Sequence, residues 1–155
     1  MEGKVVSVER VIPAPAEAIF GLVADASRHP EFDGSGAVRK VKPGAPGQLG
    51  AGSTFGMSMH VGTNYSMVNT VIEFEPNRRI AWQTRPGGFA GRFVGGRIWR
   101  YELEPTDGGT LVRESWDTSR DHQGSLLRLG GLPEKMRSNM AATLERIEEI
   151  VTAGG

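Results

Sequence analysis

The sequence contains no cysteine among its 155 residues. Disulfide bonds, thiolate nucleophiles and cysteine-ligated metal sites are therefore excluded. It also has no excess of either charge, since 18 basic and 18 acidic residues give a formal net charge of zero. Nucleic acids and anionic membranes are bound through a basic field, so we expect neither as a partner.

Long apolar runs are missing as well. No segment approaches the length of a membrane span, and the initial MEGKVVSVERV has no apolar run of the signal-peptide kind. The sequence therefore predicts a cytoplasmic protein without membrane insertion. We find no internal repeat or linker, and the length suits one domain with a real core, so we expect a single domain over residues 1–155.

What the sequence does have is a series of alternating segments joined by short turns. STFGMSMHVG, residues 53–62, places Phe55, Met57 and Met59 on one parity, which is typical of a strand with one buried face. Short turns between strands make neighbouring strands antiparallel. Strands are predicted within residues 3–15, 37–44, 53–62, 65–75, 80–86, 96–105 and 110–119.

Three segments predict helices. Residues 14–25 and part of residues 26–36 predict two short helices near the N-terminus, with Pro15 near the first turn. Residues 132–151 predict a long amphipathic helix that starts near Pro133, and SLLRLGG, residues 125–131, is expected to extend its front by a turn or two. Strands followed by a helix favour an α+β fold, with helices on one face of an antiparallel sheet.

Four segments, in this order, carry a resemblance to a known family: VERVIPAPAEAIFGLVADASRHPEF, VIEFEPNRRIAWQT, WRYELEPTDGGTLVRESWDTS and MAATLERIEEIV. They resemble the START-like (SRPBCC-type) superfamily of polyketide cyclases/dehydrases, lipid-transport domains and birch-pollen-type allergens. The resemblance implies a helix-grip fold, in which a seven-stranded curved sheet and a C-terminal helix enclose a cavity. The superfamily has no shared catalytic signature, so no catalytic residue is carried over, and we expect no cofactor.

Strand parity predicts which side chains face that cavity. Trp99 and Tyr101 share one face of their strand, with Arg97 at the mouth, and the face of Trp116 carries Glu114 inward. The candidate ligand-binding residues are Phe55, Met57, Met59, Tyr65, Met67, Asn69, Trp82, Phe89, Phe93, Arg97, Trp99, Tyr101, Glu114, Trp116, Met136 and Met140.

These residues could also form an ordinary core. A mixture of tryptophan, tyrosine and methionine, however, packs poorly without gaps and lines ligand pockets well. Glu114 is also the candidate catalytic residue, because burial raises the pKa of a carboxyl toward the range of a general acid or base. Arg97 or a tyrosine is its available partner, and Arg97 would instead hold it as an anion.

The glycine-rich segment from Arg85 to Arg97 contains Phe89 and Phe93 and lacks the lysine and hydroxyl residues of a phosphate loop. It reads either as a plain hairpin loop or as a gate with the phenylalanines as an apolar lid. His29, in a turn near the helices, His60 and His122 lack metal-ligand spacing, so we expect no metal site.

The favoured function is binding of an apolar or aromatic small molecule, lipid- or polyketide-like, by a monomer or homodimer. One alternative is an enzyme of the cyclase, aromatase or dehydratase kind, in which Glu114 or a tyrosine moves protons. A second alternative is an interaction module like the toxin-like members of the superfamily.

Overall fold

The structure is a computed structural model that describes residues 4–25, 28–32, 38–41, 49–61, 63–86 and 95–153, with the backbone alone at residues 38–41, 57–61 and 63–66. Within these ranges seven strands form one antiparallel sheet in the order β1-β7-β6-β5-β4-β3-β2. The strands are β1 (Val5–Ile12), β2 (Val38–Val41), β3 (Thr54–Val61), β4 (Thr63–Glu75), β5 (Arg79–Pro86), β6 (Arg97–Thr106) and β7 (Gly109–Asp117).

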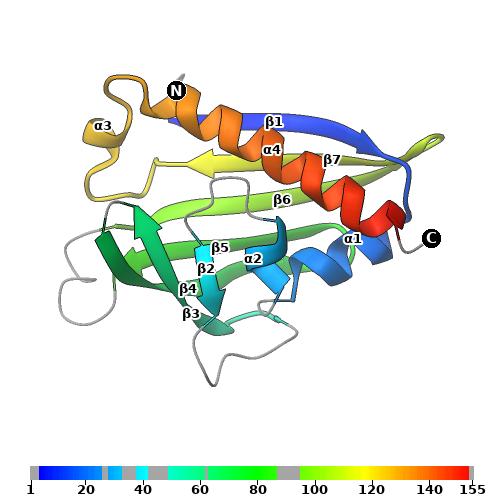
Figure 1. Ribbon diagram of the computed structural model, residues 1–155, viewed down its shortest axis with the longest axis horizontal. Helices are drawn as coiled ribbons and strands as arrows, with labels where there is room; N and C mark the ends of the chain where they lie inside the picture. The colour runs from blue at the N-terminus through cyan, green and yellow to red at the C-terminus, as the bar shows by residue number, and fades with distance from the viewer. Residues whose placement is uncertain are drawn as a thin grey trace.

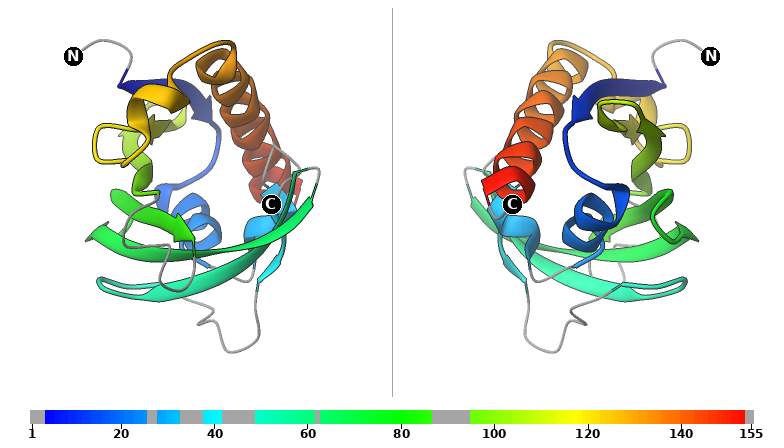
Figure 2. Two further views of the ribbon diagram at one scale, coloured as in Figure 1. Left: turned by 90° about the vertical axis from the view of Figure 1, so that its left-hand side faces the viewer. Right: turned by 90° about the vertical axis from the view of Figure 1, so that its right-hand side faces the viewer.

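Four helices accompany the sheet in the described part of the chain. They are α1 (Ala16–Val23), α2 (His29–Phe32), α3 (Gly124–Leu127) and α4 (Leu132–Ala153). The long helix α4 crosses the sheet on the side of β1 and β7 (Figure 1). Viewed end-on, the sheet curves from β1 round to β2, with α4 across its open side and α1 and α2 between them (Figure 2). This arrangement confirms the predicted helix-grip fold.

The larger of the two clusters of buried apolar residues contains the α1 side chains. The apolar face of α1 packs with Leu144 and Ile147 of α4 and with side chains from the central strands. Pro15 precedes α1 directly and Pro133 lies in the first turn of α4, as predicted, since proline suits positions whose N–H needs no helical partner. The side chains of α1 therefore form part of the main core.

Parity predicted the inner face of the sheet correctly over most of its length. Met67, Asn69 and Val71 of β4 are buried, as are Tyr101 of β6 and Glu114 of β7. In β4 the register with β5 shifts between Val71 and Glu73. Because of this bulge at Ile72, the side chain of Phe74 faces inward and that of Glu73 faces outward. The Phe74 ring meets the ring of Phe20 of α1 edge-on.

The outer face differs from the prediction at the far end of β6 and β7. Ile98 is on the outward parity but is only 1% exposed, and Ser115 and Asp117 are also buried. The chain after β7 folds back beside the start of β6, where His122 N donates to Gly95 O. Residues beyond the strand, rather than a second sheet, thus cover this end.

The segment SLLRLGG does not extend α4, and that expectation is wrong. Residues 124–127 form the separate helix α3, and the chain turns before α4 begins at Leu132. Gly130 sits in this turn at φ +62°, a conformation that interrupts a helix and that glycine adopts at little cost. Among the described residues, no helix has the length and apolar character needed to cross a membrane.

Candidate functional site

A buried tyrosine–glutamate pair lies on the inner face of the sheet. Tyr101 of β6 and Glu114 of β7 are directly opposite in register, and each is 3% exposed. The Tyr101 hydroxyl donates to Glu114 Oε2 at 2.9 Å. Of the partners that the sequence allowed for Glu114, the tyrosine is therefore the one it contacts.

Arg97 has a different partner. Its backbone N–H donates to Asp121 Oδ2 at 2.9 Å, and its guanidinium lies 3.8 Å from the same oxygen. Arg97 is also four residues along β6 from Tyr101, which corresponds to about 13 Å of extended strand. The alternative in which Arg97 fixes Glu114 as an anion is therefore wrong.

A second buried polar pair joins β4 to β5. Asn69 and Thr84 are opposite in register, and the Thr84 hydroxyl donates to Asn69 Oδ1 at 2.6 Å. Asn69 is 4% exposed and Thr84 is also buried. The two polar pairs lie on the same concave face. Between them runs a cross-strand row of side chains that contains Trp82, Trp99 and Trp116.

That row crosses the sheet through three paired tryptophans. Trp82 of β5 is opposite Trp99 of β6, which is opposite Trp116 of β7. Trp82 and Trp116 are buried, whereas Trp99 between them stays partly exposed although it packs against both core clusters. Trp99 is inward-facing on a central strand, and it is the member of this row whose side chain keeps partial exposure.

His29 belongs to an aromatic cluster that the sequence did not predict. It begins α2, is 3% exposed, and its Nε2 lies 2.8 Å from the carbonyl oxygen of Val23. Its ring stacks on Trp82 with centroids 4.9 Å apart, and it meets Phe55 and Phe32 edge-on. The expectation that His29 is a simple turn residue is wrong. The sequence around it, where a proline follows directly, has no periodic pattern from which these contacts could be predicted.

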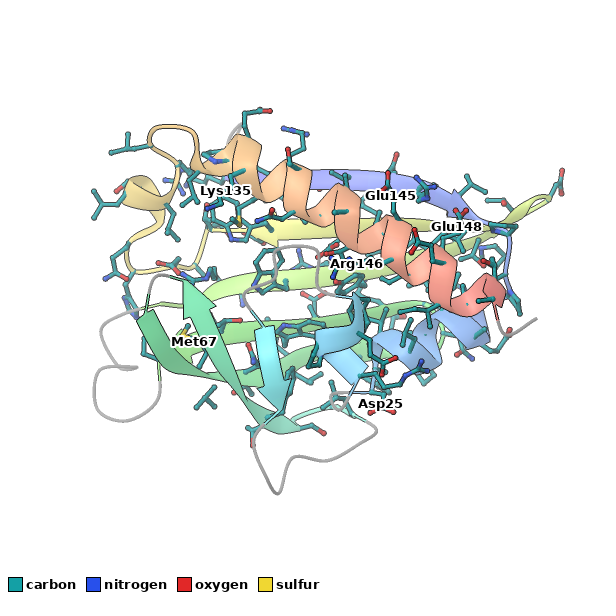
Figure 3. The ribbon with its side chains drawn as sticks, viewed as in Figure 1. Asp25, Met67, Lys135, Glu145, Arg146 and Glu148 are labelled. Carbon is teal, nitrogen blue, oxygen red and sulfur yellow. The ribbon has the colours of Figure 1, made fainter. Side chains whose placement is uncertain are left out.

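The remaining predicted site residues fall into four groups. Phe55 and Trp82 pack within the main core, and Met140 packs with Val6 and Trp116 in a second cluster that Met136 borders. Met67 is buried on β4, toward the end of the sheet away from α1 (Figure 3). The side chains of Met57, Met59 and Tyr65, and all of Phe89 and Phe93 with most of the glycine-rich loop, lie outside the described residues.

The outer face carries a network of ion pairs. Arg100 donates to both oxygens of Glu73, at 2.9 and 2.8 Å, and lies 3.5 Å from Asp117. Hydrogen bonding to Arg100 lowers the pKa of Glu73. For Asp117, burial raises the pKa, but hydrogen bonds from Ser119 and the charge of Arg100 outweigh it, so its pKa is also lowered. Both carboxyls are therefore ionised at neutral pH.

A hollow of about 350 Å³ opens on this charged face. Its lining residues are Glu75, Arg78, Arg79, Glu102, Leu103, Glu104, Leu111 and Arg113. Arg79 lies 3.2 Å from Glu102, and Arg113 pairs with Glu9. Since most of these charges are balanced within the face, the hollow offers little to an apolar ligand. No group of His, Asp and Glu side chains suited to a metal ion occurs in the described part of the chain.

Comparison with known proteins identifies the family. The family model described as "Polyketide cyclase / dehydrase and lipid transport" matches residues 4–152. The chain belongs to this family. Membership confirms the START-like resemblance and is consistent with a concave face lined by aromatic residues, and it names no catalytic residue.

Individual relatives of this family member extend the comparison. Uncharacterized protein Rv0088 of Mycobacterium tuberculosis is 31% identical over an alignment of 153 positions, which covers 92% of this chain and 62% of the relative. The chain thus spans about three fifths of the length of the curated relatives it matches.

Solved structures share the fold at low identity. Protein CV1439 from Chromobacterium violaceum is 16% identical with a TM-score of 0.71, covering 96% of both chains. The Aha1 dimer from Colwellia psychrerythraea is 16% identical with a TM-score of 0.66, covering 95% of each chain. At these identities the likeness concerns the fold alone.

Proposed function

We propose that the protein binds an apolar or aromatic small molecule, lipid- or polyketide-like, on the concave face of the sheet beneath α4. The partial exposure of Trp99 carries this proposal, since its paired neighbours Trp82 and Trp116 are both buried. A fully packed core would bury the middle residue of such a row at least as well as its neighbours. The space beside Trp99 can instead receive a ligand ring.

The polar pairs on the same face support a ligand site. Buried polar groups are tolerated where they are hydrogen-bonded, and Tyr101–Glu114 and Asn69–Thr84 lie on either side of the tryptophan row. A mostly apolar surface with a few placed polar groups is the usual composition of a small-molecule site. The lipid transport in the family's description agrees with an apolar cargo.

Titration with a naphthalene-based ligand tests the proposal. We expect a saturable change in intrinsic fluorescence, because the ligand would stack near the accessible indole of Trp99. A Trp99→Phe variant should lose most of the fluorescence response while equilibrium dialysis still detects binding. A Trp116→Phe variant, altered at the buried neighbour, should keep the response. Absence of saturable binding to the parent protein would contradict the proposal.

An enzyme is the second candidate, and the hydrogen bond between Tyr101 and Glu114 favours it. A carboxyl that is buried and hydrogen-bonded to a phenol is suited to proton transfer. If the protein dehydrates β-hydroxy ketones, Glu114→Gln should lower turnover by about 10²–10⁴-fold with binding retained. Absorbance of the conjugated enone would report this, with Tyr101→Phe as a milder companion variant. A parent protein without turnover would leave binding as the function.

A further inference from the structure

The amide of Asn69 is only half used by the protein. An asparagine side chain has one carbonyl acceptor and two N–H donors. The carbonyl oxygen of Asn69 accepts the Thr84 hydroxyl at 2.6 Å, and this bond points the Nδ2 group away from Thr84. Within the described residues, the structure gives this Nδ2 group no acceptor.

The Nδ2 group of Asn69 keeps some accessible surface, since it is not one of the fully buried polar atoms that lack a partner. The residue as a whole is 4% exposed and lies in register between Phe55 of β3 and Thr84 of β5. Its donors are therefore open to an acceptor that enters from the concave side. The sheet itself has no need of an amide at this position, since a valine or leucine would suit a buried strand position.

We propose that Asn69 donates a hydrogen bond to a neutral carbonyl oxygen of the bound ligand; this inference rests on the proposed function. Thr84 already occupies the amide oxygen, so the open end of Asn69 offers donors only. A ligand group that only accepts hydrogen bonds, such as a ketone or aldehyde, matches this end. A carboxylate fits less well, because Arg97, the basic residue in the same cross-strand row, lies 3.8 Å from Asp121.

The sheet register gives the size of such a ligand. Asn69 lies two strands across the sheet from Trp99 and two residues along the strand direction. On a flat sheet these offsets are about 10 Å and about 7 Å. Side chains converge on a concave face, so their tips are closer than the roughly 12 Å between the backbones. A ring system of two or three fused rings can therefore lie against Trp99 while its carbonyl reaches Asn69.

Two probes that differ in one chemical group test this inference. The first is 2-acetylnaphthalene, and the second is 2-isopropenylnaphthalene, in which a CH₂ group replaces the ketone oxygen. Their dissociation constants are measured by equilibrium dialysis with the parent, Asn69→Leu and Thr84→Val proteins. In Asn69→Leu we expect ketone affinity to fall about 10-fold while alkene affinity is unchanged or improved. Thr84→Val should affect the ketone less, since it keeps the donors.

The outcomes separate this inference from the proposed function. If both probes bind and Asn69→Leu leaves their affinity ratio unchanged, the role of Asn69 is overturned and binding stands. If neither probe binds the parent, the proposed function fails and the inference fails with it.

A measurement on the parent protein does not depend on the folding of any variant. The side-chain amide signals of Asn69 in a ¹⁵N–¹H NMR spectrum should move downfield with the ketone and not with the alkene. Equal shifts with both probes would overturn the inference.

Discussion

A Val8→Trp variant is expected to lose uptake of 2-acetylnaphthalene by about 100-fold or more, whereas Val11→Trp binds like the parent. Val8 faces the concave side, opposite Glu114 in register, and stays partly exposed while it packs against both core clusters. An indole there would occupy the space beside Trp99. A ligand ring displaced from this position loses about 3 kcal/mol of binding free energy from apolar burial, which lowers the affinity roughly 100-fold.

Val11 provides the matched control on the same strand. It has the opposite parity and is 51% exposed, so its indole would lie on the outer surface. Equilibrium dialysis measures affinity, and thermal unfolding checks that both variants are folded. Binding by folded Val8→Trp within about twofold of the parent would place the ligand elsewhere.

Replacing Gly109 by alanine is expected to destabilise the fold by about 3 kcal/mol or more. Gly109 has φ +139°, a conformation that side-chain-bearing residues rarely adopt. A Cβ atom there would overlap the Ile12 carbonyl oxygen and lie 2.8 Å from Pro13 Cα, and both contacts are with backbone that cannot easily move. Strain and overlap therefore act together at the turn that joins β6 to β7.

The preceding glycine is the control for this prediction. At Gly108 the nearest contact of an added Cβ is Val11 Cγ1 at 3.9 Å, an ordinary van der Waals distance. Gly108→Ala should therefore change stability by no more than about 1 kcal/mol. Urea unfolding should show a midpoint lower by about 1–2 M for Gly109→Ala alone. Similar midpoints for the two variants would refute the packing argument.

Alternation predicted the strands and the inner face, because the side-chain period of a strand is fixed at two, and the family resemblance supplied the helix-grip arrangement. Tyr101 and Glu114 were assigned inward from parity alone, and both are buried. Parity does not reveal a bulge, however, so the outward turn of Glu73 after Ile72 could not be read from the sequence. Strand parity also could not reveal that the chain after β7 folds back beside the start of β6, where Ile98 is buried.

Other features of the candidate site depend on contacts between distant segments. His29 reaches Trp82 because α2 packs under the sheet, and a four-residue helix leaves almost no periodic pattern. The choice of Tyr101 over Arg97 as the partner of Glu114 required the register of β6 against β7. Residue type indicated that a partner was needed, but only the register identified it.

The pairing of β1 with β7 also constrains when the protein can fold during synthesis. The side chains of Ser7 and Ser115 hydrogen-bond across this pair although they are 108 residues apart. At about 5–20 residues per second, the ribosome needs roughly 5–20 s to make the intervening chain. During that interval β1 has no strand to join, and its inward valines stay in water. The pairing of β1 with β7 therefore cannot form until the chain through β7 has left the ribosome.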